Sequence, residues 1–348
     1  MSDFLIIRFS SLGDVVMTTS VVEQLSIGLP EAAIHFLTMK AYAGVFDNDT
    51  RIKKVIAIKG SESPQRIVRM TGGKPFDAVI DLHGSLRSIA VSTLIHSPRK
   101  VRLNKHPITR RLMVWSKNRF QRNFDVLESY LQTLTPFGLG TFVLPKITPS
   151  EKTLHAANAL LHAYSPGCET SAVGIAPGAK HPPKRWNEES FARLADLISA
   201  QGNLPVFIGD RDDEDVVKNI QGMMSCESLS LAGKVDLTMT IGVIALLKGL
   251  VSNDSGPMHI AGALRAPFVA VFGPTHPNLG FVPGYPSGSI LHTGVPCSPC
   301  SIHGEKPCWM ESRFCMNDIT SEMVFEELMR VMKLNAQRKG SDASEGES

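Results

Sequence analysis

What the sequence lacks excludes several classes of protein. Its 348 residues contain no apolar run near the roughly 20 residues that a membrane-spanning helix needs. No basic segment stands at the N-terminus, where an apolar run of strand length begins at Phe4, so we expect no secretory signal peptide. Six cysteines do not make a disulfide scaffold in a chain of this length. Together these absences predict a globular cytoplasmic protein.

Two further absences concern ligands. No Gly-x-Gly-x-x-Gly follows the first apolar run, which argues against an NAD-dependent enzyme. No Asp or Glu lies between residues 82 and 124, where ten Lys and Arg side chains occur. These cations would repel one another unless an anion shares their surface, and nucleic acid, anionic lipid or a phosphorylated glycan would each serve. Few rings and no nucleic-acid motif accompany them, so nucleic acid ranks last.

Apolar runs of strand length alternate with helix-length segments in two successive series. The first contains residues 4–9, 33–38, 54–58 and 76–82, and the second contains residues 172–179, 204–210, 229–231, 250–252 and 267–272. This alternation predicts two α/β domains with parallel sheets, which we place at residues 1–165 and 166–336. The cleft between them is the default ligand site. Residues 337–348, rich in Gly, Ser and charge, predict a disordered tail.

Residues 249–264 give the strongest signal for a binding site. After a short apolar run, Asp254 and Ser255 offer oxygens that cap a helix, and Gly256 lets another molecule approach the backbone. A helix N-terminus at the carboxyl end of a strand binds anions. His259 falls about one turn into the predicted helix and would add a hydrogen-bond donor.

A second corner, by which we mean a strand that runs into a turn, follows directly. The strand run 267–272 ends in Gly273-Pro274-Thr275, which predicts a turn. A single such corner is more often an ordinary helix cap than a site. Two successive corners that face one ligand predict a phosphate site.

With these motifs in place, the sequence resembles the ADP-heptose:lipopolysaccharide heptosyltransferases, which are inverting glycosyltransferases of family 9 with the GT-B fold. The residues that carry the resemblance are 6–19, 76–84, 177–179, 184–186, 253–256 with His259, and 272–275, and they occur in the family's order. The ordered set is specific, although no single motif is.

The resemblance implies the fold and the substrates. The fold would be α/β, with two Rossmann-like doubly wound domains facing across a cleft. The C-terminal domain would bind ADP-L-glycero-D-manno-heptose, and the N-terminal domain would bind the anionic lipid A–Kdo acceptor. The enzyme would need no metal or cofactor and would associate peripherally with the cytoplasmic face of the inner membrane.

The resemblance also implies two catalytic residues. Asp14 matches the general base that takes the proton of the acceptor hydroxyl, although it could equally cap a helix beginning at Val15. Lys184 matches the lysine that neutralises the donor diphosphate as ADP departs. The neighbouring Arg185 is an alternative that the sequence does not separate from Lys184.

Binding residues follow from the same match. Donor contacts are expected at Gly13, Thr18, Lys184, Asp210, Asp254, Ser255, Gly256, His259, Gly273 and Thr275. The acid that binds the ribose is left open between Asp210 and Asp212. Acceptor contacts are expected from the basic stretch, at Arg87, Arg110, Arg111 and Arg119.

Four cysteines precede the last helical segment, at positions 297, 300, 308 and 315. The Cys297-x2-Cys300 opening could belong to a structural zinc site with Cys308 and Cys315. Disulfides and reduced, packed thiols are the alternatives, and related enzymes carry a similar set.

Two other functions are compatible with this fold. A nucleotide-sugar epimerase would process the sugar without any acceptor. It would not need the cation run, the ten Lys and Arg side chains between residues 82 and 124. A non-catalytic nucleotide- or anion-binding relative would not need Asp14, Lys184 and His259 together.

Overall fold

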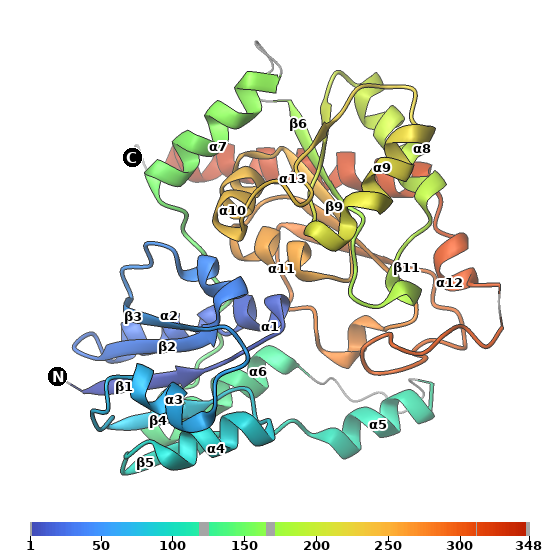
Figure 1. The fold of residues 1–348 in the computed structure, drawn as a ribbon. Coiled ribbons are helices and arrows are strands. Elements are labelled where there is room, and N and C mark those ends of the chain that lie inside the picture. The colour runs from blue at the N-terminus through green and yellow to red at the C-terminus, as the bar shows by residue number, and fades with distance from the viewer. Residues whose placement is uncertain (1, 118–124, 165–170, 311, 346–348) are drawn as a thin grey trace. The chain divides into compact units, whose positions relative to one another are not determined.

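The computed structural model describes residues 2–117, 125–164, 171–310 and 312–345, with side chains up to residue 338. The chain forms two compact units. The first unit comprises residues 1–107, 125–150 and 280–283, and the second comprises 108–124, 151–279 and 284–348. Each unit contains its own sheet (Figure 1).

The first unit is built on a five-stranded parallel sheet with the order β3-β2-β1-β4-β5. Its strands are β1 (Asp3–Ile7), β2 (Ala33–Met39), β3 (Ile52–Ile58), β4 (Ala78–Asp81) and β5 (Arg99–Arg102). Leu5, Ile6 and Ile7 of the central strand are fully buried, as expected for a parallel strand covered on both faces. Strand order reverses between β1 and β4, so the carboxyl ends of these two strands mark the switch point where ligands bind in open α/β sheets.

Short helices and 3-10 turns follow the strands of this unit along the chain. They are α1 (Leu12–Met17), α2 (Thr19–Gly28), the 3-10 turn η1 (Lys40–Phe46), α3 (Pro64–Met70), α4 (Leu86–Leu94), α6 (Val126–Leu131) and the 3-10 turn η2 (Gln132–Phe137). Helix α5 (Pro107–Trp115) begins at the last residue of the segment 1–107 and continues into residues assigned to the second unit.

The second unit has a six-stranded parallel sheet with the order β11-β10-β9-β6-β7-β8. Its strands are β6 (Ala172–Ala176), β7 (Leu204–Phe207), β8 (Leu229–Ser230), β9 (Gly249–Asn253), β10 (Phe268–Phe272) and β11 (Gly288–His292). Its helices are α7 (Glu151–Tyr164), α8 (Glu188–Ala200), α9 (Glu214–Met223), α10 (Leu237–Leu246), α11 (Gly256–Ala263), α12 (Phe314–Asn317) and α13 (Ser321–Glu345), with 3-10 turns at η3 (Pro182–Lys184), η4 (Arg211–Asp213) and η5 (Pro277–Leu279). Here the order reverses between β9 and β6.

The strands, the domain division and the tail each differ from the sequence predictions. Strands β5 and β11 were not expected, because both lie at a sheet edge and neither contains a fully buried residue. Helix α7, expected in the first domain, belongs to the second unit, where Thr153 and Ala157 pack against Gly242 of α10. The disordered tail predicted from residue 337 is wrong up to Glu345, since α13 continues that far. Extending an existing helix costs much less than nucleating one.

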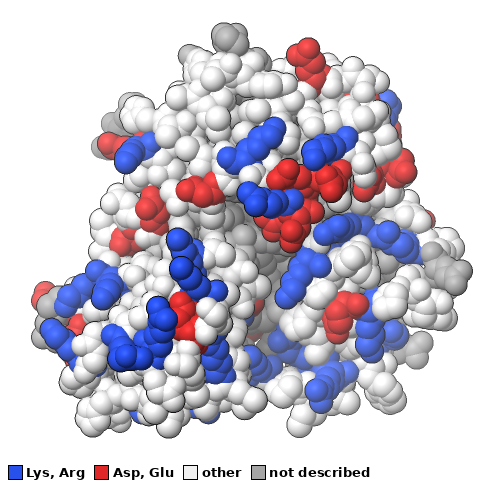
Figure 2. Space-filling model, viewed as in Figure 1, with Lys and Arg blue, Asp and Glu red and all other residues white. Residues whose placement is uncertain are grey.

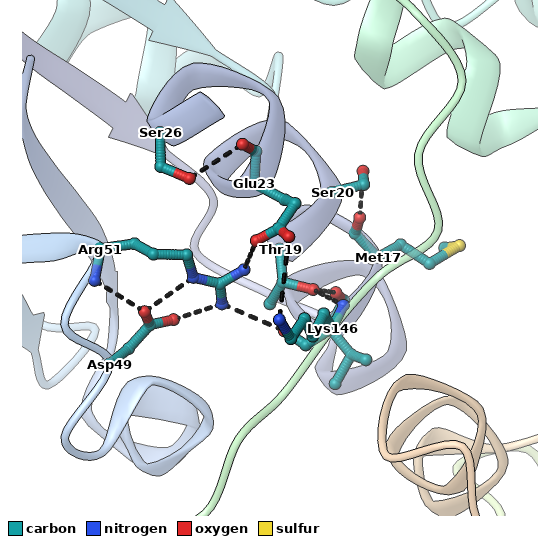
Figure 3. A network of polar contacts seen from close by, with 9 residues as sticks. Met17, Thr19, Ser20, Glu23, Ser26, Asp49, Arg51 and Lys146 are labelled. Atoms are coloured by element: carbon teal, nitrogen blue, oxygen red, sulfur yellow. Dashed lines mark hydrogen bonds and ion pairs between the residues drawn. The ribbon is translucent and has the colours of Figure 1, made fainter. Parts of the chain in front are cut away.

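A polar network attaches the connecting segment 141–150 to the first unit (Figure 3). The Arg51 guanidinium donates to Glu23 and to Asp49, each at 2.6 Å, and to the Lys146 carbonyl at 3.1 Å. The Lys146 amide donates to the Thr19 hydroxyl at 3.0 Å. Arg51 therefore joins α2, the turn before β3 and the segment that leads to the second unit.

Among the described residues, none of the helices combines the length and the apolar character that crossing a bilayer would require.

The Arg51 network yields a stability prediction. Replacing Arg51 by Met leaves the carboxylates of Glu23 and Asp49, only 17% and 11% exposed, without their common cation. We expect the free energy of unfolding to fall by about 1.5–3 kcal/mol, the range for hydrogen bonds to charged groups. Urea denaturation followed by circular dichroism measures this change.

The matched control is Lys53→Met. Lys53 is 51% exposed and pairs with Asp3 at 3.5 Å, so its loss should change stability by less than about 1 kcal/mol. Equal losses in the two variants would show that the Arg51 network contributes no more than a surface ion pair.

Candidate active site

Asp14 lies beyond the carboxyl end of β1, at the switch point of the first sheet. Its Oδ2 accepts hydrogen bonds from the Arg8 guanidinium at 2.6 Å and from the Ser11 hydroxyl at 2.7 Å, and the Ser11 amide approaches it at 3.2 Å. Its Oδ1 accepts a hydrogen bond from the Tyr130 hydroxyl at 2.8 Å. These contacts hold the carboxylate in one orientation. Because it is 18% exposed, it still reaches solvent.

The expected helix start at Val15 is wrong by three residues. Helix α1 begins at Leu12 with Ser11 as its N-cap, so Asp14 is the third helical residue and its side chain turns back to the Ser11 amide. An acid at this position satisfies a free backbone N–H at the helix start. The local sequence thereby fixes the Asp14 carboxylate at the sheet edge.

Arg8 and Asp14 form a tightly coupled ion pair. Burial raises the pKa of Asp14, but the Arg8 charge and the bonds from Ser11 and Tyr130 outweigh it, so the pKa of Asp14 lies well below its usual range. The Arg8 guanidinium also donates to the Leu82 carbonyl at 2.6 Å and lies 5.5 Å from the centre of the Tyr130 ring. Asp14 is therefore ionised at neutral pH.

His83 follows β4 at the same switch point. Its amide donates to Asp81 Oδ1 at 3.0 Å, and its ring packs 5.0 Å from the ring of Phe9. Burial, followed by the charges of Arg8 and Lys105, lowers the pKa of His83 to about 4. A neutral imidazole thus stands in the electrostatic field of the Arg8–Asp14 pair.

The other residues predicted in this unit have structural contacts of their own. Gly13 is buried in α1, and the buried Thr18 hydroxyl donates to the Val15 carbonyl at 2.7 Å. The Arg87 guanidinium donates to the carbonyls of Gly60 and Glu62 at 2.7 and 2.6 Å. Their binding roles stay predictions.

Of the remaining acceptor candidates, Arg110 and Arg111 both lie on α5, where Arg111 is exposed. Arg119 lies outside the described residues. The acceptor roles of all three stay predictions.

The second unit brings three predicted donor residues into direct contact. Lys184 Nζ lies 2.6 Å from Asp254 Oδ2, and the Thr275 hydroxyl donates to the same oxygen at 2.6 Å. Lys184 and Asp254 are only 14% and 8% exposed, and Thr275 is buried. They come from the loops after β6, β9 and β10, three adjacent strands of the sheet.

The buried Asn253 holds this cluster together. Its Nδ2 donates to the Pro177 carbonyl at 2.7 Å, and its Oδ1 accepts from the Trp186 amide at 3.0 Å. The loop that carries Lys184 is thereby tied at two points to the end of β9. Gly304 covers the Lys184 side chain, and a Cβ at that glycine would stand 2.5 Å from Lys184 Cγ.

The start of α11 has the predicted form. Ser255 is its N-cap, Gly256 is its first residue, and among the described residues Ser255 Oγ has no hydrogen-bond partner. His259 is buried, with its ring 6.4 Å from the Tyr285 ring. The Gly273 carbonyl accepts from the Ser298 hydroxyl at 2.9 Å. The structure therefore supplies a helix N-terminus beside the Lys184–Asp254–Thr275 cluster.

Asp213, which the sequence did not single out, also lies against the loop after β6. The Asp210 carboxylate accepts from the Asp212 amide at 2.9 Å and caps η4. The Asp213 carboxylate instead lies against Gly178 and Gly209, where a Cβ on either glycine would overlap it. Burial and then Asp210 raise the pKa of Asp213. Gly178 and Gly209, where a larger residue would overlap Asp213, were the sequence signal that could have pointed to this acid.

The four cysteines of residues 297–315 converge on one pocket. Cys297, Cys300, Cys308 and Cys315 are free thiols that line a cavity of about 250 Å³, together with Pro182 and Pro183 beside Lys184. Burial raises the pKa of Cys300, and it raises the pKa of Cys315 to about 11. Within the described residues no three His, Cys, Asp or Glu side chains are grouped as metal ligands, so zinc here stays a prediction.

Comparison with known proteins identifies the family. Residues 65–307 match the model of glycosyltransferase family 9 (heptosyltransferase). Lipooligosaccharide heptosyltransferase 2 of Haemophilus influenzae is 27% identical over 300 residues, which cover 79% of this chain and 84% of that protein. Other curated relatives are named heptosyltransferases 1 and 3.

Solved structures show the same fold. The E. coli ADP-heptose lps heptosyltransferase II aligns with a TM-score of 0.75 at 22% identity and covers 96% of this chain and 99% of its own. The E. coli heptosyltransferase WaaC with ADP-2-deoxy-2-fluoro heptose aligns with a TM-score of 0.64 at 19% identity, covering 94% and 99%. The two doubly wound parallel sheets of this chain have their counterparts in these structures.

These matches confirm the resemblance found in the sequence. The chain belongs to glycosyltransferase family 9, the heptosyltransferases, and is a glycosyltransferase with the GT-B fold.

Proposed function

We propose that the protein transfers a heptose from ADP-L-glycero-D-manno-heptose to the inner core of lipopolysaccharide, with inversion at the anomeric carbon. The acceptor is Kdo-lipid A or its heptosylated form. The observation that carries the proposal is the contact of Lys184, Asp254 and Thr275 at the switch point of the second sheet. We place the donor there, in the domain expected from residue 166 onward, and the acceptor in the N-terminal domain.

The proposed site for the sugar nucleotide has the groups that bind a diphosphate. An ammonium, a hydroxyl and the free N–H groups at the start of α11 stand together, and phosphate oxygens accept from such donors. Asp254 repels phosphate, so we assign it to the sugar hydroxyls and to orienting Lys184. The helix start also offers Ser255 Oγ, which has no hydrogen-bond partner among the described residues. A structural relative was solved with an ADP-heptose analogue, which supports this class of donor.

In the reaction, the acceptor oxygen forms a bond to the heptose anomeric carbon while its proton passes to Asp14. The bond from that carbon to the β-phosphate oxygen breaks, and ADP leaves with the electron pair. Lys184 stabilises the charge that develops on the departing phosphate, so its contribution is larger in the transition state than in the bound donor.

Asp14 has the geometry of a proton acceptor. Its Oδ2 takes three contacts, whereas Oδ1 takes only the bond from Tyr130 among the described residues. Oδ1 is therefore the oxygen we assign to the proton. The Arg8 charge keeps the carboxylate ionised but weakens it as a base. Displacement of the Tyr130 hydroxyl by the acceptor would raise the basicity again.

The anionic acceptor fits the cation run. Residues 82–124 carry no acid, and Arg111 of α5 is exposed. We propose that Arg110 and Arg111 attract the phosphates and carboxylates of the acceptor at the cytoplasmic face of the inner membrane.

The function is tested by mass spectrometry. The protein is incubated with ADP-heptose and, separately, with Kdo-lipid A and with heptosylated Kdo-lipid A. We expect one of the two acceptors to gain the mass of one heptose. Conversion of the donor sugar without any acceptor would favour an epimerase instead, and binding of ADP-heptose with no chemistry would favour a non-catalytic relative.

The base assignment is tested by Asp14→Asn. We expect transfer to fall by at least about 100-fold, within the range that general base catalysis contributes. Affinity for ADP, measured by calorimetry, should stay within about two-fold, because the donor site lies in the second unit and a two-fold change is under 0.5 kcal/mol.

The control for this variant is Asp47→Asn. Asp47 is an exposed carboxylate of the same unit, and its loss should change neither quantity. Retained transfer in Asp14→Asn would reject Asp14 as the base.

A further inference from the structure

Helix α5 exposes large apolar side chains along one face. Ile108 is 74% exposed, Leu112 is 44% exposed and Trp115 is 81% exposed. The spacing of four and then three residues places them one above another on a single helical stripe. The exposed Arg111 follows Ile108 by three residues, so it lies beside that stripe on the helix surface.

The remaining side chains of α5 show that this is its outward face. Met113 is fully buried, and Thr109, Arg110 and Val114 are half-buried. The helix therefore turns Met113 inward and three large apolar residues outward. Removing these exposed side chains from water would favour association with an apolar environment. A contiguous apolar stripe of this kind marks an interaction surface rather than ordinary exposed area.

The charges around the stripe indicate what it contacts. The chain has no Asp or Glu from residue 82 to residue 124, and Arg102, Lys105, Arg110, Arg111 and Lys117 all lie within about ten residues of Leu112 in the sequence. Figure 2 shows the charged side chains on one face of the molecule. Exposed apolar side chains in a stretch of sequence that carries cations and no acids complement an anionic lipid surface.

The composition of the stripe also suits a bilayer interface. Trp is favoured at headgroup level, Ile and Leu enter the acyl boundary, and Arg extends its guanidinium back to the phosphates. A helix of nine residues is too short to span a bilayer but long enough to lie in its surface.

We propose that α5 docks the protein on anionic phospholipid bilayers through Ile108, Leu112 and Trp115. The inference deepens the proposed function, on which it rests for its biological setting, because an enzyme acting on a lipid-anchored acceptor must work at a membrane. Docking would confine the search for the acceptor to the membrane plane. The cations around the stripe contact anionic groups at the membrane surface, which are the phospholipid headgroups and, for Arg110 and Arg111, also those of the lipid-anchored acceptor.

Vesicle binding tests the proposal. Full-length protein is sedimented with vesicles of phosphatidylglycerol and phosphatidylcholine, and with vesicles of phosphatidylcholine alone. We expect binding to the anionic vesicles to be at least ten-fold tighter. The triple variant Ile108→Ser, Leu112→Ser, Trp115→Ser should bind anionic vesicles at least ten-fold more weakly than the unaltered chain. Unchanged binding of this variant, or equal binding to the neutral vesicles, overturns the proposal.

The matched control is Ile27→Ser. Ile27 on α2 is 61% exposed and apolar, and it lies outside the cation run, so its replacement should leave vesicle binding unchanged. An equal loss in Ile27→Ser would show that vesicles bind any exposed apolar residue, which also overturns the proposal.

Fluorescence gives a second readout that needs no destabilising change. The chain has three Trp, of which Trp186 is buried and Trp309 is 70% exposed. In a Trp309→Phe background, Trp115 is the only exposed one among them. We expect anionic vesicles to shift its emission to the blue and brominated acyl chains to quench it. Emission unaffected by brominated lipid would contradict insertion of α5.

A de-acylated, water-soluble acceptor separates this proposal from the proposed function. The triple variant should transfer heptose to that acceptor as the unaltered protein does, and lose at least ten-fold in transfer to the same acceptor embedded in vesicles. If the unaltered protein transfers to neither acceptor, the proposed function fails. If the variant keeps full transfer on vesicles, the docking surface fails and the proposed function stands.

Discussion

The site depends on one constraint of parallel sheets, which is that all strands end at the same edge. Where strand order reverses, the loops that leave two neighbouring strands turn to opposite faces and open a crevice between them. In the first sheet this point lies between β1 and β4, and in the second it lies between β6 and β9. Asp14 and His83 follow the first pair of strands, and Lys184 and Asp254 follow the second.

At each of these points a largely buried ion pair fixes one of the two groups to which we assign a chemical role. Arg8 holds Asp14 in the first unit, and Asp254 holds Lys184 in the second. A buried pair is weak evidence for stability, because desolvation offsets much of the attraction. Here each ion pair orients the side chain to which we assign a chemical role. The Asp14 carboxylate is held by Arg8, Ser11 and Tyr130, and the Lys184 ammonium is held by Asp254, so the proposed chemistry would need little reorganisation of either group.

The sequence predicted the architecture well because its strands are buried on both faces and read as continuous apolar runs. It placed α7 in the wrong unit, because a helix between two domains carries no local sign of which sheet it packs on. Asp254 and Thr275 were predicted because each follows a strand run directly, and Lys184 was predicted from the family resemblance. Arg8, Tyr130 and Asp213 were missed because their roles depend on side-chain contacts in the folded chain that no local sequence pattern shows. Tyr130 is 116 residues from Asp14.

The central claim is that the switch point of the second sheet holds the donor diphosphate. A crystal structure with a non-transferable ADP-heptose analogue tests it most directly. The account predicts the diphosphate within hydrogen-bond distance of Lys184 Nζ and of the first amides of α11. A nucleotide bound elsewhere, with the Lys184–Asp254 pair unchanged and no phosphate against it, would contradict it.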